Sequence, residues 1–297
     1  MGIRKKQIRI YLGKHFRMFW TKKAWSTFII AAVISLAVSY VQSKNMFKYN
    51  LQTWEGVTVL ISACIWIGIF NSVQLICRER GTLKHEHRTG LHMSSYFCSH
   101  VIFQTGICFV EAIILLIISC QFLKYPSQAL LINTKFEFLI TYFLTMLAAD
   151  VLGLALSSIV KTSDLAMTVM PFILIFELIF SGAFFSVSGP IGKLSTVTIC
   201  KYSMTAACIS ANYNTLEDTE KIMVSRKIHD MLERQDLPFA YDQVEQIIDE
   251  NYEVATNNAY NYTRLNLIKQ GAILLLHTLA TAIIGIFALE FIDYDKR

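Results

Sequence analysis

The stretch at residues 152–185, LGLALSSIVKTSDLAMTVMPFILIFELIFSGAFF, decides the class of fold, because two long apolar runs flank a short polar turn at residues 161–164. A helix needs about 20 apolar residues to cross the hydrocarbon core of a bilayer. Runs of similar length occur at about residues 25–41, 57–76, 96–123, 136–160, 165–187 and 268–292. We therefore expect an all-α membrane protein with six transmembrane helices.

The composition supports a membrane protein. Of the 297 residues, 54% are hydrophobic and only 16% are charged, whereas about a quarter of the residues in soluble domains are charged. Six crossings of about 20 residues leave roughly 150 residues for loops and ends. This length has no room for a soluble catalytic domain, and we expect no nucleic-acid partner.

The distribution of Lys and Arg predicts the orientation in the membrane. The first 24 residues contain no acid and eight bases, namely Arg4, Lys5, Lys6, Arg9, Lys14, Arg17, Lys22 and Lys23. Further bases fall between the second and third runs, and Lys161 lies between the fourth and fifth. Because short cytoplasmic loops are enriched in Lys and Arg, we expect a multi-pass protein of the cell membrane with both termini in the cytoplasm.

The segments outside the spans have distinct patterns. In residues 1–24, apolar side chains recur at spacings of three and four (Ile8, Leu12, Phe16, Phe19 and Trp20), with Lys6, Lys14 and Arg17 largely on the other side. This pattern predicts an amphipathic helix along the inner leaflet; the alternative is a basic tail that only sets the topology. Residues 188–267 include a long acidic stretch with possible helix starts at Thr215 and Asp242, which predicts a small outer helical cap. Residues 293–297 are expected to form a short cytoplasmic tail.

The common signatures of catalysis are missing from the sequence. The nearest approach to a phosphate-binding loop, GPIGKL at residues 189–194, has the wrong spacing and lacks the final Ser or Thr. There is no HExxH zinc motif, no GxSxG elbow and no CxxC pair. We expect no catalytic residue, no metal site and no bound cofactor in this chain.

The loop at residues 77–97, CRERGTLKHEHRTGLHMSSYF, is short and dense in charge. It resembles the coupling-helix segment of ABC-2 type ABC transporter permeases, and most of all that of the G subfamily, at Glu79, Arg80, Glu86, Gly90, Ser95 and Tyr96. Leu91 stands where that pattern commonly has tyrosine. The stretch at residues 152–185 resembles the same family from the fourth span through the fifth. The alternative reading of the loop is a solvated, positively charged connection.

The resemblance implies a non-catalytic permease subunit that pairs with a second, identical or homologous permease. Two ATP-binding subunits, which hold the ATP and Mg, would dock on the N-terminal helix and on a coupling helix at about residues 78–92. The implied coupling residues are Glu79, Arg80, Lys84, Glu86, Arg88 and Gly90. The implied cavity residues are Cys64, Ile67, Phe70, Asn71, Pro171, Ile175, Glu177 and Leu178, and the outer gate falls on Ala183 and Phe184. A re-entrant hairpin is expected at about residues 191–210.

Such a permease is expected to serve an ATP-driven exporter of an amphipathic, lipid-like, peptide or drug-like substrate, since apolar cavity walls offer contact area without a fixed hydrogen-bond pattern. Polysaccharide export is a further possibility within the family. Two other classes stay open. An ion-coupled secondary transporter would use the intramembrane carboxylates Glu111, Asp150 and Glu177 as a proton relay, although these groups are otherwise expected to be protonated or paired with neighbouring helices. A membrane sensor would bind a peptide with the acidic cap.

Overall fold

The structure is a computed structural model that describes residues 2–21, 24–182, 189–234 and 257–291. Within these ranges the regular elements are all helical. The α-helices are α1 (Gly2–Thr21), α2 (Ser26–Val41), α3 (Asn50–Ser72), α4 (Leu75–Arg88), α5 (Met93–Phe122), α6 (Thr134–Ile159), α7 (Ser163–Phe180), α8 (Ile199–Ser210), α9 (Thr219–Arg234) and α11 (Arg264–Glu290). Short 3-10 helices occur at η1 (Gly189–Val197), η2 (Tyr213–Thr215) and η4 (Asn258–Tyr260).

The six predicted spans correspond to α2, α3, α5, α6, α7 and α11. Among the described residues, five helical stretches are long and apolar enough to cross a membrane by themselves. The sixth candidate joins α1 to the 16-residue α2 across a bend of 70°. The prediction of an all-α membrane protein is therefore confirmed.

Two helix boundaries differ from the predicted runs. The second helix begins at Asn50 rather than residue 57 and ends at Ser72, so Ile76 belongs to α4. The last helix begins at Arg264 rather than residue 268. The residues added at these helix starts include polar side chains, which keep helical geometry but lower the local hydropathy below that of a predicted span. Residues 183–187, the end of the fifth predicted run, lie outside the described residues.

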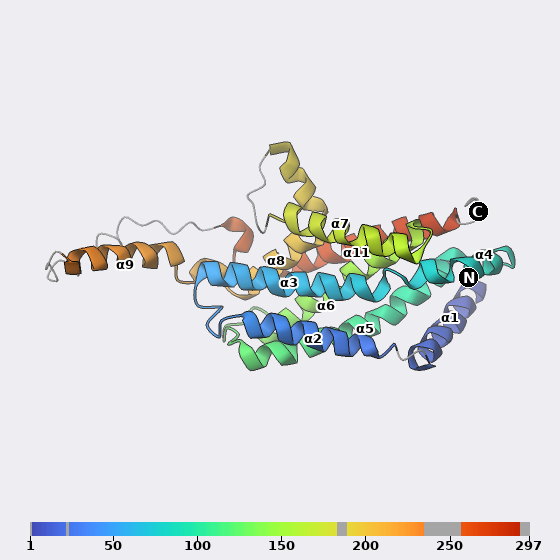
Figure 1. The fold of residues 1–297 in the computed structure, drawn as a ribbon, viewed down its shortest axis with the longest axis horizontal. Coiled ribbons are helices and arrows are strands. Elements are labelled where there is room, and N and C mark those ends of the chain that lie inside the picture. The colour runs from blue at the N-terminus through green and yellow to red at the C-terminus, as the bar shows by residue number, and fades with distance from the viewer. Residues whose placement is uncertain (1, 22–23, 183–188, 235–256, 292–297) are drawn as a thin grey trace.

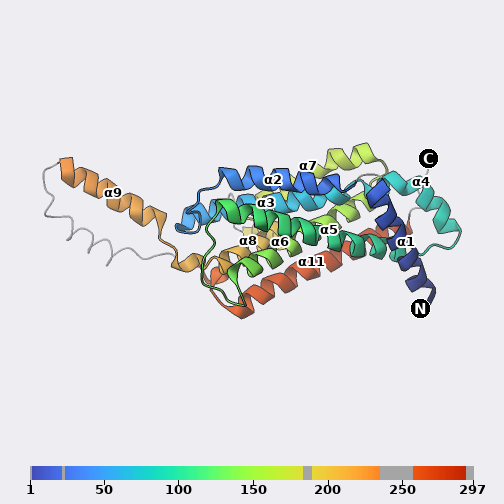
Figure 2. The ribbon, with the colours of Figure 1, turned by 90° about the horizontal axis from the view of Figure 1, so that it is seen from below.

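The centre of the bundle is the contact between α3 and α6. Here Gly68 lies against the backbone of α6, so that a Cβ atom at this position would lie 2.4 Å from the carbonyl oxygen of Met146. A Cβ atom at Gly153 would lie 2.3 Å from the Ser72 Oγ. Glycine at these positions lets the two backbones approach closely, which is a common basis of helix association in membranes. The helices α2 and α5 lie on one side of this pair, and α8 and α11 pack along α6 (Figure 2).

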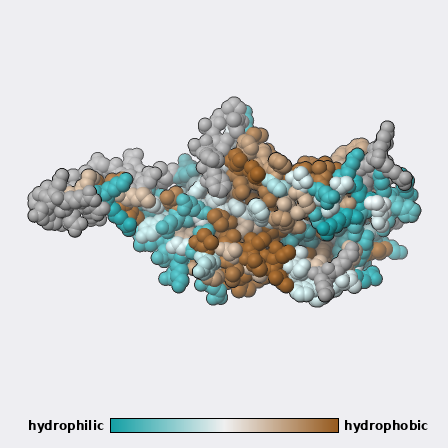
Figure 3. Space-filling model, viewed as in Figure 1, coloured by the Kyte–Doolittle hydropathy of each residue, from teal (hydrophilic) through white to brown (hydrophobic). Residues whose placement is uncertain are grey.

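The two ends of the bundle differ. The helices α1 and α4 and the C-terminal end of α11 lie at one end, whereas α9 projects beyond the other (Figure 1). On the face shown in Figure 3, hydrophobic residues gather in the middle of the bundle and hydrophilic residues flank them. The predicted helix start near Thr215 corresponds to the beginning of α9 at Thr219, and the one at Asp242 lies outside the described residues.

Candidate coupling site

The first turns of α4 are hydrogen-bonded to the end of α6. The first amides of a helix have no partner within the helix, and here the backbone N–H groups of Ile76 and Cys77 both donate to the Ser157 Oγ of α6 at 3.0 Å. One turn later, the Arg80 guanidinium donates to the carbonyl oxygens of Ser158 and Val160, each at 2.9 Å. These carbonyls end α6, where a cation is favoured by the helix dipole. The start of α4 is therefore fixed to the end of a central span.

The end of α4 is closed by a Schellman motif. The Leu91 N–H donates to the Glu86 carbonyl oxygen at 3.1 Å, and the Gly90 N–H donates to the His87 carbonyl oxygen at 3.0 Å. This motif needs a left-handed residue, and Gly90 has a φ of 103°. The Gln7 side chain of α1 donates to the Gly90 carbonyl oxygen at 2.9 Å. The α1 helix therefore holds the turn that follows α4.

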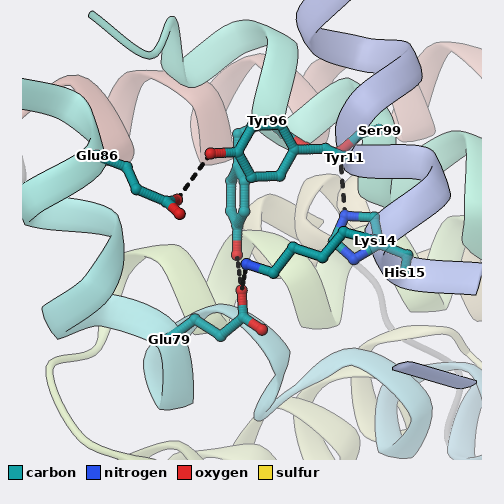
Figure 4. A network of polar contacts seen from close by, with 7 residues as sticks. All are labelled: Tyr11, Lys14, His15, Glu79, Glu86, Tyr96 and Ser99. Carbon is teal, nitrogen blue, oxygen red and sulfur yellow. Dashed lines mark hydrogen bonds and ion pairs between the residues drawn. The ribbon is translucent and has the colours of Figure 1, made fainter. Parts of the chain in front are cut away.

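Two carboxylates of α4 bind α1 and α5 (Figure 4). The Glu79 Oε2 lies 3.2 Å from the Lys14 Nζ of α1 and accepts a hydrogen bond from the Tyr96 hydroxyl of α5 at 3.1 Å. The Tyr11 hydroxyl of α1 donates to the Glu86 Oε2 at 2.7 Å. We call Tyr11, Lys14, Glu79, Glu86 and Tyr96 the coupling network. It joins the predicted interfacial helix, the predicted coupling helix and a membrane span.

His15, the residue after Lys14, is buried in the contact between α1 and α5. The His15 Nε2 lies 3.1 Å from the Ser99 Oγ, and its ring centroid lies 3.9 Å from that of His100. Burial lowers the pKa of His15 to about 4, against a smaller opposing effect of Glu79. Burial and the bond to Glu86 raise the pKa of Tyr11. At neutral pH the imidazole of His15 is thus uncharged and the Tyr11 hydroxyl remains a donor.

The predicted coupling residues do not form one surface. Glu79 and Glu86 turn toward α1 and α5, Arg80 binds the end of α6, and Gly90 forms the helix cap. Lys84 is half-buried, and Arg88 is exposed. The outward side of α4 is a different stripe, which we call the exposed α4 face; it consists of Arg78, Gly81, Thr82, His85 and Arg88.

The polar side of α1 has a partner that the sequence did not predict. Lys14, expected opposite the apolar side chains of an interfacial helix, binds Glu79 of α4. Phe16 and Trp20 of the predicted apolar side are 59% and 63% exposed, as expected of side chains that face lipid. The sequence signal that was missed is the polar series Gln7, Tyr11 and Lys14, whose spacing of four and three residues places them on one helix face.

The predicted cavity residues separate into buried and exposed groups. Cys64 and Ile67 are buried inside the chain, at 0% and 3% exposure, whereas Phe70 and Ile175 are 41% and 52% exposed. Pro171 is exposed, Leu178 is half-buried, and Asn71 donates to the Glu111 Oε2 at 2.7 Å. On α3 the exposed stripe also contains Trp66, whose ring centroid lies 5.7 Å from that of Phe70 and which sequence reasoning missed. Ala183 and Phe184 lie outside the described residues.

The three intramembrane carboxylates all have partners within the chain. Besides the Asn71–Glu111 contact, the Gln104 amide donates to the Asp150 Oδ1 at 2.8 Å. The Glu177 Oε2 accepts from the Cys200 N–H at 3.1 Å, so this carboxylate of α7 caps the start of α8. Glu177 is 4% exposed, in contrast to the exposed Phe70 and Ile175.

The chain is a multi-pass membrane protein in which α1 packs on α4 and α5 at one end of the bundle. A transporter permease has an architecture of this kind. Residues 6–209 match the family model described as ABC-2 type transporter. This match covers more than half of the chain, and the chain belongs to that family.

A curated relative points to the same class. Over 161 residues the chain is 25% identical to the ABC transporter ATP-binding/permease protein Rv1747 of Mycobacterium tuberculosis. The match covers 52% of this chain and 19% of the relative. The chain thus spans about a fifth of the length of this relative, whose name combines an ATP-binding part with a permease part.

Proposed function

We propose that the chain is the non-catalytic permease subunit of an ATP-driven exporter, energised by two copies of a separate ATP-binding subunit that hold ATP and Mg. The family membership supports a permease, and the coupling network is the observation that carries the mechanism. The excess of Lys and Arg near α1 and α4 supports a cytoplasmic location of this end of the bundle and of both termini, by the positive-inside rule. The permease would then present α4 to the ATP-binding subunit.

The proposed docking surface is the exposed α4 face from Gly81 onward, together with the adjoining end of α1. A partner that moves α4 must also move α1, because the two helices share the Lys14–Glu79 and Tyr11–Glu86 contacts. It must also move α5, because the Tyr96 hydroxyl binds the same Glu79 carboxylate. In this mechanism Glu79 and Glu86 are positioning residues that transmit motion, and the ATP-binding subunit touches the opposite side of the helix.

The proposed transport path lies between two permease subunits, identical or homologous. The helix α7 supports this arrangement, since it packs on the bundle through one narrow stripe and leaves Phe172, Ile175 and Ile179 exposed at 69%, 52% and 41%. With Trp66 and Phe70 of α3, these residues offer an apolar, aromatic wall for an amphipathic, lipid-like, peptide or drug-like substrate. We leave Glu177 out of this wall because its carboxylate caps α8.

Reconstitution tests the proposal. The purified chain in liposomes is expected to hydrolyse no ATP, and addition of its ATP-binding subunit should give hydrolysis that a transported substrate stimulates. Glu79→Lys should lower the substrate stimulation and leave basal hydrolysis by the ATP-binding subunit in place. Transport by the chain alone, driven by a proton gradient, would show instead that it is an ion-coupled carrier.

A further inference from the structure

A cavity of about 380 Å³ lies where α1 bends into α2, enclosed by α1, α2, the α3–α4 junction and α5. We call it the elbow cavity. Its volume is at the lower end of the range of small-molecule sites, about 300–1,000 Å³. It lies beside the coupling network, and its lining includes Phe70 of the exposed α3 stripe but no residue of α7.

The inner part of the elbow cavity is apolar and aromatic. Phe19 of α1, Phe70 of α3 and Phe103 of α5 line it together with Ile107. The ring centroids of Phe19 and Phe103 lie 5.8 Å apart in an edge-to-face arrangement. Such walls suit a hydrocarbon chain, which needs contact area and no hydrogen bonds.

The polar part of the cavity carries positive charge. Arg78 is exposed, and its guanidinium binds the neutral amide oxygen of Gln74; among the described residues no acid is paired with it. The acid beside it in the lining, Glu79, is already held by Lys14 and by the Tyr96 hydroxyl. An anionic group therefore fits beside Arg78, while a cationic group would be repelled there.

A second observation concerns a buried polar atom of the lining. His100 lines the cavity and is 4% exposed, yet its Nε2 has no hydrogen-bond partner among the described residues. Buried polar atoms without a partner are rare in native proteins. Because a neutral imidazole carries its proton on either nitrogen, the His100 Nε2 has the capacity to donate to a phosphate or ester oxygen.

We propose that the elbow cavity binds one anionic phospholipid, taken from the leaflet that contacts α1. Its phosphate lies beside Arg78, and an oxygen of its head-group region binds the His100 Nε2. One acyl chain enters the space between the phenylalanines, while the second stays in the bilayer. The volume of about 380 Å³ favours one chain over a complete two-chain lipid. Anionic lipids are plentiful in the cytoplasmic leaflet, where basic segments bind them, and the first 24 residues carry bases and no acid.

The position of the cavity gives the lipid a role in holding the α1–α2 bend against the α3–α4 junction. Its walls come from both sides of the contact that the coupling network makes. The inference is independent of the direction and substrate of transport, so failed ATP coupling would leave it intact and a failed lipid test would leave the proposed function intact.

The test is a binding titration of the purified full-length chain in mild detergent, followed by native mass spectrometry. The probes are short-chain phosphatidylglycerol, phosphatidylcholine with the same chains, and glycerol 3-phosphate. We expect one molecule of the phosphatidylglycerol to bind with clear preference over the phosphatidylcholine. Glycerol 3-phosphate, which lacks chains, should bind at least tenfold more weakly. Equal binding of the two phospholipids, or tight binding of glycerol 3-phosphate, would overturn the proposal.

Three variants locate the site. Arg78→Gln should weaken phosphatidylglycerol binding about fivefold, the effect of one base near a lipid surface. Ser26→Trp, at an exposed position of the cavity lining, should fill the cavity and abolish binding. Arg17→Gln is the matched control, because Arg17 is exposed on α1, lies outside the cavity lining and donates to the Gly13 carbonyl oxygen; it should change affinity less than twofold. If the control weakens binding as much as Arg78→Gln, or Ser26→Trp leaves it unchanged, the cavity is not the site.

Discussion

The Lys14 ammonium of α1 and the Glu79 carboxylate of α4 lie 3.2 Å apart, with their side chains 33% and 20% exposed. This pair joins two helices that are 65 residues apart in the sequence. Partly exposed ion pairs contribute little to stability, at most about 1 kcal/mol. The role of the Lys14–Glu79 pair is therefore to fix the orientation of α4 relative to α1.

An exchange of these two charges tests that view. Glu79→Lys alone places two cations together and removes the acceptor of Tyr96, so we expect the substrate-stimulated ATP hydrolysis to fall severalfold. Lys14→Glu combined with Glu79→Lys restores the attraction and should recover part of that loss. The measurement is substrate-stimulated ATP hydrolysis by the reconstituted complex. An exchange variant no better than Glu79→Lys would show that the ion pair has no part in coupling.

Two glycines of the α4 region should respond in opposite directions to replacement by alanine. Gly90 has a φ of 103°, and a Cβ atom there would touch nothing within 4 Å, so Gly90→Ala adds only backbone strain of about 1–2 kcal/mol. Gly81 is a helical residue with equally open surroundings, so Gly81→Ala should stabilise α4 by about 0.5–1 kcal/mol. Chemical unfolding in detergent measures both. If both variants shift stability in the same direction, the Schellman cap is not formed as described.

The docking of α1 on α5 should weaken in acid. The pKa of His15 is lowered by burial from 6.5 to about 4, so the undocked helix binds a proton more readily than the docked one. The stabilisation is therefore complete above pH 6.5 and is lost as the pH falls toward 4. The polar groups that face His15 are Tyr11 and Lys14 of α1, Glu79 of α4, and Tyr96, Ser99 and His100 of α5.

Hydrogen exchange of the α1 amides at several pH values measures this dependence. Protection in the wild-type chain should decrease between pH 6.5 and 4, and His15→Phe should remove most of the decrease. A pH profile that is unchanged in the His15→Phe variant would assign the effect to another group.

The cap made by Glu177 should matter for stability more than for substrate choice. Glu177→Leu leaves the Cys200 N–H without its acceptor in a buried position, at a cost of about 1–3 kcal/mol. Glu177→Gln keeps an acceptor oxygen and should lose less than half as much. Unfolding of the two variants in detergent tests this order. If the leucine variant were as stable as the wild type but had a changed substrate preference, Glu177 would belong to the transport path rather than to the cap of α8.

Hydropathy was sufficient for the fold, because the apolar runs depend on local sequence and correspond to the spans. The charged loop around Glu79 and Glu86, whose resemblance to a family segment predicts a coupling helix, is helical in α4, and its role in coupling stays a prediction. The direction of those two carboxylates was not predictable in this way. It depends on where α1 crosses α4, and the contacts of Glu79 with Lys14 and of Glu86 with Tyr11 span 65 and 75 residues.

The assignment of cavity residues failed to separate two faces of one helix. Cys64, Ile67 and Phe70 of α3 are all apolar, so their residue types do not predict which of them contacts α6 and which stays exposed. The close approach of Gly68 to α6 decides that Cys64 and Ile67 are buried within the chain. Only the packed bundle shows this.

The most direct test of the proposed mechanism is photo-crosslinking from the exposed α4 face. A photoreactive amino acid at Thr82 or His85, both exposed on α4, should crosslink to the ATP-binding subunit in the assembled complex. The same amino acid at Met223, which is 54% exposed on α9 at the other end of the bundle, should not. Crosslinks from Met223 and none from Thr82 or His85 would contradict the account.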